Sequence, residues 1–189
     1  MSLLTENLPK TIKINGSKYK INTDFRIWLK FANILIHGKQ EISIKTKSLL
    51  SLVYPIIPED IETAIQEMLN FFFDKNNMTK SSEQNKKNIY DFEKDSEYIY
   101  AAFKQQYNVD LIDIEYMHWH QFRAMFNAIS DDTQIYKIMQ IRSMDLGSIK
   151  DKEQKKHIRK LKLKYMLPDN RSEEEKEAEF SACFASAFI

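Results

Sequence analysis

Apolar residues recur at helical spacing through two neighbouring segments in the middle of the chain, residues 91–107 and 113–129. The first segment repeats at steps of three and four residues: Phe92, Ser96, Ile99, Phe103 and Tyr107. In the second, a helical turn of about 100° per residue gathers one face: Ile114, His118, Trp119, Gln121, Phe122, Met125, Phe126 and Ile129. The same turn directs His120, Arg123 and Asn127 toward solvent. We therefore expect two amphipathic helices that pack face to face.

Residues 11–21 alternate between apolar and polar side chains on both sides of Asn15-Gly16. Asn-Gly supplies the two positive φ angles of a type I′ turn, so the segment predicts a β-hairpin that pairs Ile12 with Tyr19. One face then holds four apolar side chains: Ile12, Ile14, Tyr19 and Ile21. An isolated hairpin is only marginally stable, so we expect the next helix to cover this face.

Other apolar stripes predict further helices. They cover residues 22–38, with capping residues at the start and Gly38 at the end, 45–54, 58–72, and a segment after Asp131 that ends before Gly147. Residues 74–88 lose all periodicity and predict a flexible linker. The expected fold class is mainly α (α+β), a helical bundle with an N-terminal β-hairpin, in one domain over residues 1–167.

Residues 150–164 carry eight lysine or arginine side chains and two acidic ones, a net charge of +6. Such a helix can contact nucleic acid phosphates, or it can be a solvated helix anchored by a few apolar residues. No aromatic residues alternate with the cations to stack on bases, and the whole chain has a net charge of only +1. The pattern favours the solvated helix, so nucleic acid is not an expected partner.

The end of the chain, residues 168–189, is first acidic and then apolar. Residues 171–179 have a net charge of −3, and Phe180, Phe184 and Phe188 follow at four-residue spacing. A helix with such a ridge either docks on its own domain or binds a partner, and the pattern leaves both open. The acidic part can also pair with the basic segment of the same chain or of a neighbouring copy, so self-association is expected.

No pattern in the sequence indicates catalysis or metal binding. The chain has one cysteine, Cys183, and lacks a Gly-rich phosphate loop, a nucleophile elbow and zinc-site spacing. His118 and His120 are two residues apart, so a helix would turn them in opposite directions, and His118 is expected to be buried with one hydrogen-bond partner. We expect no enzyme activity, no metal and no cofactor. The single cysteine suits a reducing cytoplasm, and no apolar run is long enough for a membrane span.

Several short motifs occur in a recognisable order. They are Asn15-Gly16, residues 19–29, Tyr90-Asp91-Phe92 with Asp95, residues 99–103, Tyr107, Asp110-Leu111, His118-Trp119 with Phe122, and Asp131-Asp132-Thr133 with residues 137–139 and 141–142. This order resembles the bacteriophage "gene product fifteen" family of tailed phages and prophages of Gram-positive bacteria. The similarity covers about residues 8–146 and is weaker to about residue 167. His120 departs from it, because the family usually has a second Trp there.

The resemblance implies a role in phage tail morphogenesis. Genes of this family lie just upstream of the tape-measure gene, in the place of a tail assembly chaperone. Such a chaperone would bind the tape-measure protein in the cytoplasm of the bacterial host and keep it soluble until the tube polymerises. Candidate partner-binding residues are Phe180, Phe184, Phe188, Trp119 and His120. The alternatives are a structural head–tail or tail-terminator component of the virion, and a nucleic-acid-binding regulator.

Overall fold

The computed structural model describes residues 5–37, 41–73 and 89–168. Within these ranges the chain forms one antiparallel hairpin and seven helices: β1 (Thr11–Ile14), β2 (Ser17–Lys20), α1 (Phe25–His37), α2 (Ile42–Val53), α3 (Ile61–Phe73), α4 (Ser96–Tyr107), α5 (Trp119–Asn127), α6 (Gln134–Ser143) and α7 (Lys152–Lys164). The predicted class, mainly helical with an N-terminal hairpin, is confirmed. The predicted linker at 74–88, Gly38, and residues 169–189 lie outside the described residues.

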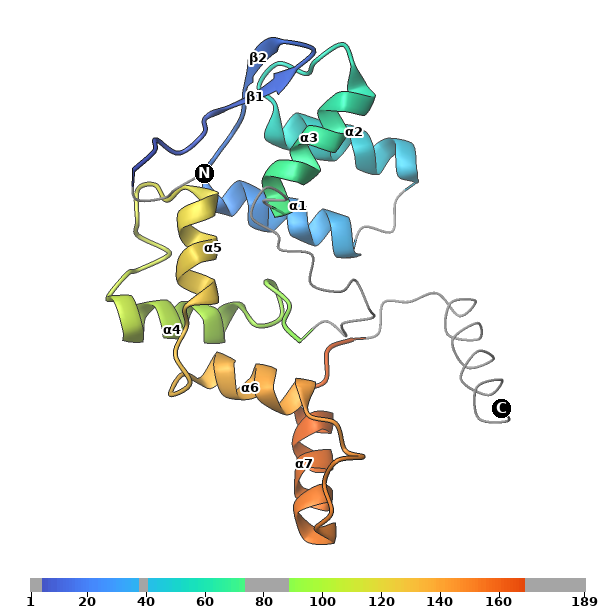
Figure 1. Cartoon of the computed structure of the whole chain (residues 1–189), viewed down its shortest axis with the longest axis vertical. Helices are drawn as coiled ribbons and strands as arrows, with labels where there is room; N and C mark the ends of the chain where they lie inside the picture. Colours follow the sequence, from blue (N-terminus) through green and yellow to red (C-terminus); the bar gives the residue numbers. More distant parts are fainter. Residues whose placement is uncertain (1–4, 38–40, 74–88, 169–189) are drawn as a thin grey trace.

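The elements follow one another along an elongated body (Figure 1). The hairpin, α2 and α3 form one end, and α1 and α5 lie in the middle. Below them α4 and α6 run across the body, and α7 projects at the opposite end. The two ends are therefore built from different parts of the sequence, the first from its beginning and the second from its last third.

The hairpin has the register that its turn residues predict. Ile12 is opposite Tyr19, and the φ angles of Asn15 and Gly16 are 49° and 83°, both in the left-handed region that the type I′ turn requires. The two isoleucines of β1 are buried. The predicted cover is wrong, because β1 packs against α3 and not against α1.

Hydrogen bonds attach both ends of the hairpin to its neighbours. Asn15 Nδ2 donates to Asp60 Oδ2 (2.8 Å), just before α3, which holds the turn against the start of that helix. At the other end, Asn22 donates from its backbone N–H to Val53 O (2.8 Å) and from its side chain to Leu52 O (2.9 Å). The chain that leaves the hairpin is thus bound to the end of α2 before α1 begins.

The core is a stack of aromatic rings centred on Trp28. Its ring lies 4.7 Å from Phe71, 5.2 Å from Phe31, and 6.3 Å from Trp119 between centroids. Phe122 of α5 continues the stack toward α4. Buried residues of β1 and of the first six helices belong to this one cluster, and Tyr19 of β2 packs against it. α1 and α5 therefore form the centre of the described structure.

The starts of α1 and α5 are joined by an isolated antiparallel β-bridge between Asp24 and His118. Phe25 N–H donates to Met117 O (2.9 Å), and Trp119 N–H donates to Thr23 O (2.8 Å). Asp24 Oδ1 also accepts from the Arg26 N–H (2.9 Å), which confirms the predicted cap of α1. Two helix starts that are far apart in the sequence are held side by side in this way.

Both central helices begin later than their apolar stripes predict. Asp91 Oδ1 accepts the N–H groups of Glu93 and Lys94 (2.9 Å each), which forms a turn, and α4 begins only at Ser96. α5 begins at Trp119, because His118 is its N-cap in an extended conformation (φ −67°, ψ 142°). Residues 113–117 therefore precede the helix, and Ile114 does not belong to the helical face on which its spacing places it.

A buried ion pair connects α4 with α6. Arg142 Nη1 and Nη2 donate to the two carboxylate oxygens of Asp95 at 2.6 and 2.9 Å. The same guanidinium donates to Tyr165 O (2.6 Å) after α7 and to Ile89 O (3.1 Å) before α4. Lys162 of α7 donates in turn to Arg142 O (2.8 Å). One arginine thus fixes the relative positions of α4, α6 and α7.

Candidate functional site

An apolar groove of about 390 Å³ opens between α1, α4 and the loop of residues 108–117. Its lining residues are Phe25, Leu29, Phe92, Ser96, Glu97, Ile99, Tyr100, Leu111, Ile112 and Phe122. We call this site the α1–α4 groove. Its volume lies within the range of about 300–1,000 Å³ that is usual for ligand sites, which are mostly apolar with a few polar groups. It is the candidate functional site of the described chain.

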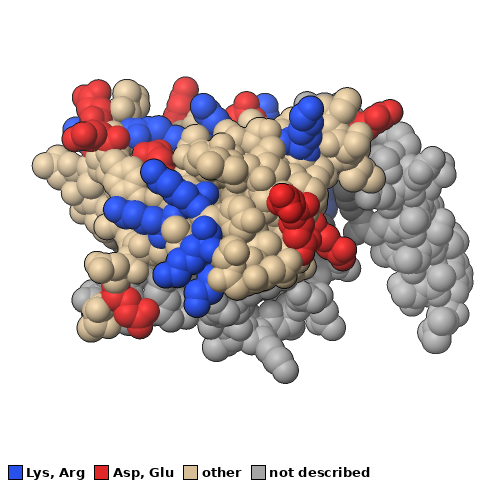
Figure 2. Space-filling model, turned by 90° about the horizontal axis from the view of Figure 1, so that it is seen from above, with Lys and Arg blue, Asp and Glu red and all other residues tan. Residues whose placement is uncertain are grey.

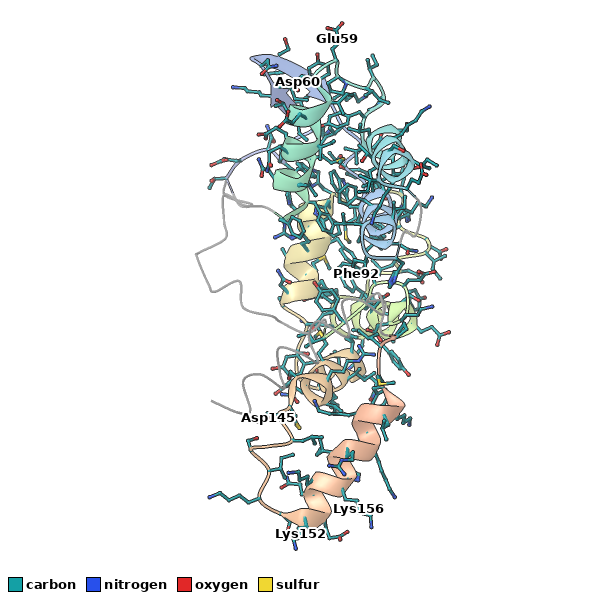
Figure 3. All side chains as sticks on the ribbon, turned by 90° about the vertical axis from the view of Figure 1, so that its right-hand side faces the viewer. Glu59, Asp60, Phe92, Asp145, Lys152 and Lys156 are labelled. Carbon is teal, nitrogen blue, oxygen red and sulfur yellow. The ribbon has the colours of Figure 1, made fainter. Side chains whose placement is uncertain are left out.

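The floor of the groove consists of aromatic rings that belong to the core. Phe25 and Phe122 are stacked with their centroids 5.0 Å apart and their planes at 12°. Phe92 lies 6.0 Å from Phe122 and is placed by the Asp91 turn, near the middle of the molecule (Figure 3). Because these rings pack against one another, the floor is formed before any ligand binds.

The loop of residues 108–117 forms the outer wall and is fixed to the start of α1. The Arg26 guanidinium donates to Leu111 O (3.2 Å) and to Ile114 O, and its Cζ lies 4.9 Å from the centre of the Phe25 ring. Thr23 Oγ1 and Tyr116 Oη are hydrogen-bonded at 2.7 Å. The wall is thus positioned by the same segment that begins α1.

Asp110 ties this loop to α4. Its carboxylate accepts from Tyr100 Oη (2.9 Å) and Lys104 Nζ (3.3 Å). The backbone N–H of Ile112 and these side-chain donors hold the pKa of Asp110 below its usual range, and the same carboxylate raises the pKa of Tyr100. At neutral pH the carboxylate is ionised and the hydroxyl is protonated, as this bond requires.

The lining determines what the groove can bind. Its polar groups are the hydroxyls of Ser96 and Tyr100 and the carboxylate of Glu97, its one charged side chain. Ile112 at the rim is 75% exposed, so apolar surface is presented to solvent. Among the described residues no three His, Cys, Asp or Glu side chains are grouped to hold a metal. The groove suits apolar side chains of a polypeptide, with Glu97 available to a cation or an N–H group.

Two of the predicted partner-binding residues are parts of the core. Trp119 is 1% exposed, and its indole N–H donates to Phe72 O (3.1 Å). The prediction that His120 faces solvent is wrong, since it is 6% exposed and its ring lies 4.5 Å from that of Phe71. The other three candidates, Phe180, Phe184 and Phe188, lie outside the described residues.

His118 is buried, as predicted, and caps α5. Its Nδ1 accepts the backbone N–H of His120 (3.1 Å), and its Nε2–H donates to Pro9 O (3.0 Å). Gln121 completes a capping box by accepting the His118 N–H (3.1 Å). Burial lowers the pKa of His118, opposed by the bond to Pro9. The His118 and His120 rings are 5.2 Å apart, so the prediction that they point in opposite directions is wrong.

The α1–α4 groove was not predictable from single stripes. Phe25, Leu29 and Ile99 have the spacing of core residues, and nothing local indicates that they lie beside the loop of residues 108–117. The one available signal is Ile112, an apolar residue between acidic ones in a connecting segment. It marks the rim but does not indicate what lies opposite.

The basic helix α7 has no buried residue. Ile158, Leu161 and Tyr165 are half-buried, and Lys152 and Lys156 project from the end opposite to Glu59 and Asp60 (Figure 3). At that opposite end, cations and anions are interspersed (Figure 2). The surface charge is thus asymmetric along the molecule, with the cations of α7 at its far end.

The sequence model of the bacteriophage Gp15 protein family matches residues 4–167. The chain belongs to this family. It is therefore a bacteriophage protein of the virion-morphogenesis kind. None of the curated proteins and none of the solved structures matches it. Within the described ranges, no helix is long and apolar enough to span a membrane.

The motifs that carry the family resemblance contact one another in the structure. Asp24, from the motif of residues 19–29, is bridged to His118, and Asp95 is paired with Arg142 from the last motif. These contacts join helices and bury charges. The motifs therefore describe the scaffold of the family, and the α1–α4 groove is held by it.

Proposed function

We propose that this protein is a tail assembly chaperone that binds the tape-measure protein through the α1–α4 groove and keeps it soluble in the host cytoplasm until the tail tube forms. Family membership supports a role in building the virion. The observation that carries the finer assignment is the groove itself, an apolar trough with one charged lining residue, Glu97. A surface of this kind suits apolar polypeptide.

The expected ligand is one face of an amphipathic helix. Such a helix presents apolar side chains at positions i, i+3, i+4 and i+7, which can contact the partly exposed Leu29, Phe92 and Ile112 of the lining. Burial of apolar surface contributes roughly 25 cal/mol per Å² before the cost of ordering, so one short groove binds weakly. Several copies along one long helix would increase the apparent affinity. No bond is made or broken in this process.

The test is co-expression of this protein with the tape-measure protein of the same phage. The wild type is compared with Ile112→Glu at the rim and with Ile42→Glu on α2 as matched control, since both side chains are largely exposed (75% and 84%) and neither substitution disturbs the core. We expect soluble, co-purified tape-measure protein with the wild type and the control, and little with Ile112→Glu. A tape-measure protein that never co-purifies with the wild type would refute the proposal, and equal capture by both variants would refute the site.

Purified virions provide a second test. A chaperone leaves before the particle is complete, so mass spectrometry of finished particles should find the tube protein and not this chain. Stoichiometric amounts of this chain in the particle would instead favour a structural head–tail or tail-terminator component.

A further inference from the structure

The described chain ends close to the α1–α4 groove. Arg142 donates both to Tyr165 O, three residues before the end of the described chain, and to Ile89 O. Ile89 is followed three residues later by Phe92 of the groove floor, a separation of at most about 10 Å along the chain. From Tyr165 to Phe180 there are fifteen further residues, which can extend over roughly 50 Å. The end of the sequence is therefore long enough to reach the groove of its own chain.

The sequence of this end matches the surfaces that it would meet. Residues 171–179 have a net charge of −3. They begin seven residues after the end of α7, whose segment, 150–164, has a net charge of +6 and buries no residue. Residues 180–189 have no charged side chain, and three phenylalanines recur at four-residue spacing. Along the chain, the acidic residues come first and can meet the cations of α7. The apolar ridge follows and can meet the apolar groove, which is the order that docking requires.

We propose that residues 180–188 occupy the α1–α4 groove of the same chain when no partner is bound, and that a partner helix has to displace them. The displacement step depends on the proposed chaperone function; the docking itself does not. A tethered segment acts at an effective concentration in the millimolar range, so even weak docking keeps the groove covered. This cover would prevent the exposed apolar rim from associating with other polypeptides before the correct partner is present.

Cys183 provides the probe, because it is the only cysteine of the chain and lies between Phe180 and Phe184. The experiment measures the rate at which a thiol reagent modifies Cys183 in the full chain, relative to a free peptide of residues 169–189. We expect the full chain to react at least tenfold more slowly than the peptide. Ile112→Glu should return the rate to within about twofold of the peptide, and Ile42→Glu should leave it slow.

Three outcomes would overturn the proposal. In the first, Cys183 of the wild type reacts as fast as the free peptide, which shows that the segment is not docked. In the second, both variants react as slowly as the wild type, which shows that the segment docks outside the groove. A rate that falls as the protein concentration rises would assign the docked segment to a second copy. Because no tape-measure protein is present, failure here leaves the chaperone proposal intact, and failed co-purification leaves the docking intact.

Discussion

The middle of the molecule and its far end are held by different kinds of contact. Around Trp28, which is 0% exposed, aromatic rings from α1, α3 and α5 pack against one another. At the far end α7 buries no residue, and the hydrogen bonds through Arg142 and Lys162 hold it near its C-terminal end. The comparison indicates that the fold depends on the middle, while α7 can vary in sequence and charge with little effect on stability.

The largest expected effect is the loss of Trp28. Trp28→Ala removes a ring that contacts Phe31, Phe71 and Trp119, and should lower the free energy of unfolding by about 3–5 kcal/mol. Chemical denaturation measures it, and Ile42→Ala, at an exposed position, should change stability by no more than about 0.5 kcal/mol. A loss below about 1 kcal/mol for Trp28→Ala would remove the basis of the comparison.

The next effect lies where the two regions meet. Asp95→Ala leaves the Arg142 guanidinium buried without its carboxylate, which should cost about 3 kcal/mol. The double variant Asp95→Ala with Arg142→Met should be more stable than the single one, because no unpaired charge remains. Urea denaturation of the wild type and the variants completes the cycle; strictly additive losses would contradict a direct coupling.

A smaller effect is expected at the wall of the groove. Arg26→Ala removes the donors to Leu111 O and Ile114 O, and because the guanidinium is partly exposed the loss should be about 1 kcal/mol. Binding of the tape-measure protein should decrease more than stability does, since the loop of residues 108–117 loses its attachment. Arg159→Ala on α7 is the control, and equal effects of the two on binding would contradict the assignment of the wall.

The cap of α5 should give the middle region a pH dependence. The folded pKa of His118 is lowered by burial, so protons bind the unfolded chain more readily. The contribution of His118 to the free energy of unfolding is complete above its unfolded pKa, about 6.5. It is lost as the pH falls through the lower folded pKa. His118→Asn keeps an acceptor that can cap the helix. The variant loses the bond to Pro9, which should lower the free energy of unfolding by about 1 kcal/mol. It should also remove this part of the pH dependence. Thermal unfolding between pH 5 and 8 measures it; an unchanged profile would contradict it.

The smallest effect is expected on α7. Lys156→Ala removes an exposed cation and should change the free energy of unfolding by no more than about 0.5 kcal/mol. The same variant tests the alternative role of this helix. If the protein bound nucleic acid through α7, affinity for a DNA duplex would fall steeply with salt and further in Lys156→Ala; we expect no such affinity in the wild type.

Local patterns predicted the elements well, because each depends on residues close in sequence. Asn15-Gly16 defines the register of the hairpin, and Asp24 caps α1. Helix boundaries and neighbours were less predictable: α5 begins only after His118, an unusual N-cap, and His120 is buried because Phe71 of α3 packs against the first turn of that helix. Likewise α6 begins after Thr133, whose Oγ1 accepts the Tyr136 N–H, and not after Asp131.

Contacts between distant segments could not be predicted in this way. The hairpin is covered by α3, and Asn15 bonds to Asp60 just before that helix, a contact that no periodicity encodes. The α1–α4 groove combines Leu29, Phe92 and Ile112, three residues from segments far apart in the sequence. A pattern can show that each is apolar; only the packed chain shows that an open space lies between them.

The bridge at the start of α5 has a consequence for synthesis on the ribosome. Thr23 and Tyr116, which bond beside it, are 93 residues apart, so α1 emerges long before the segment that covers it. At a translation rate of about 5–20 residues per second, α5 is synthesised on the order of ten seconds after Trp28. During that interval α5 does not yet cover this apolar surface of α1, and the speed of translation determines how long the surface stays without that cover.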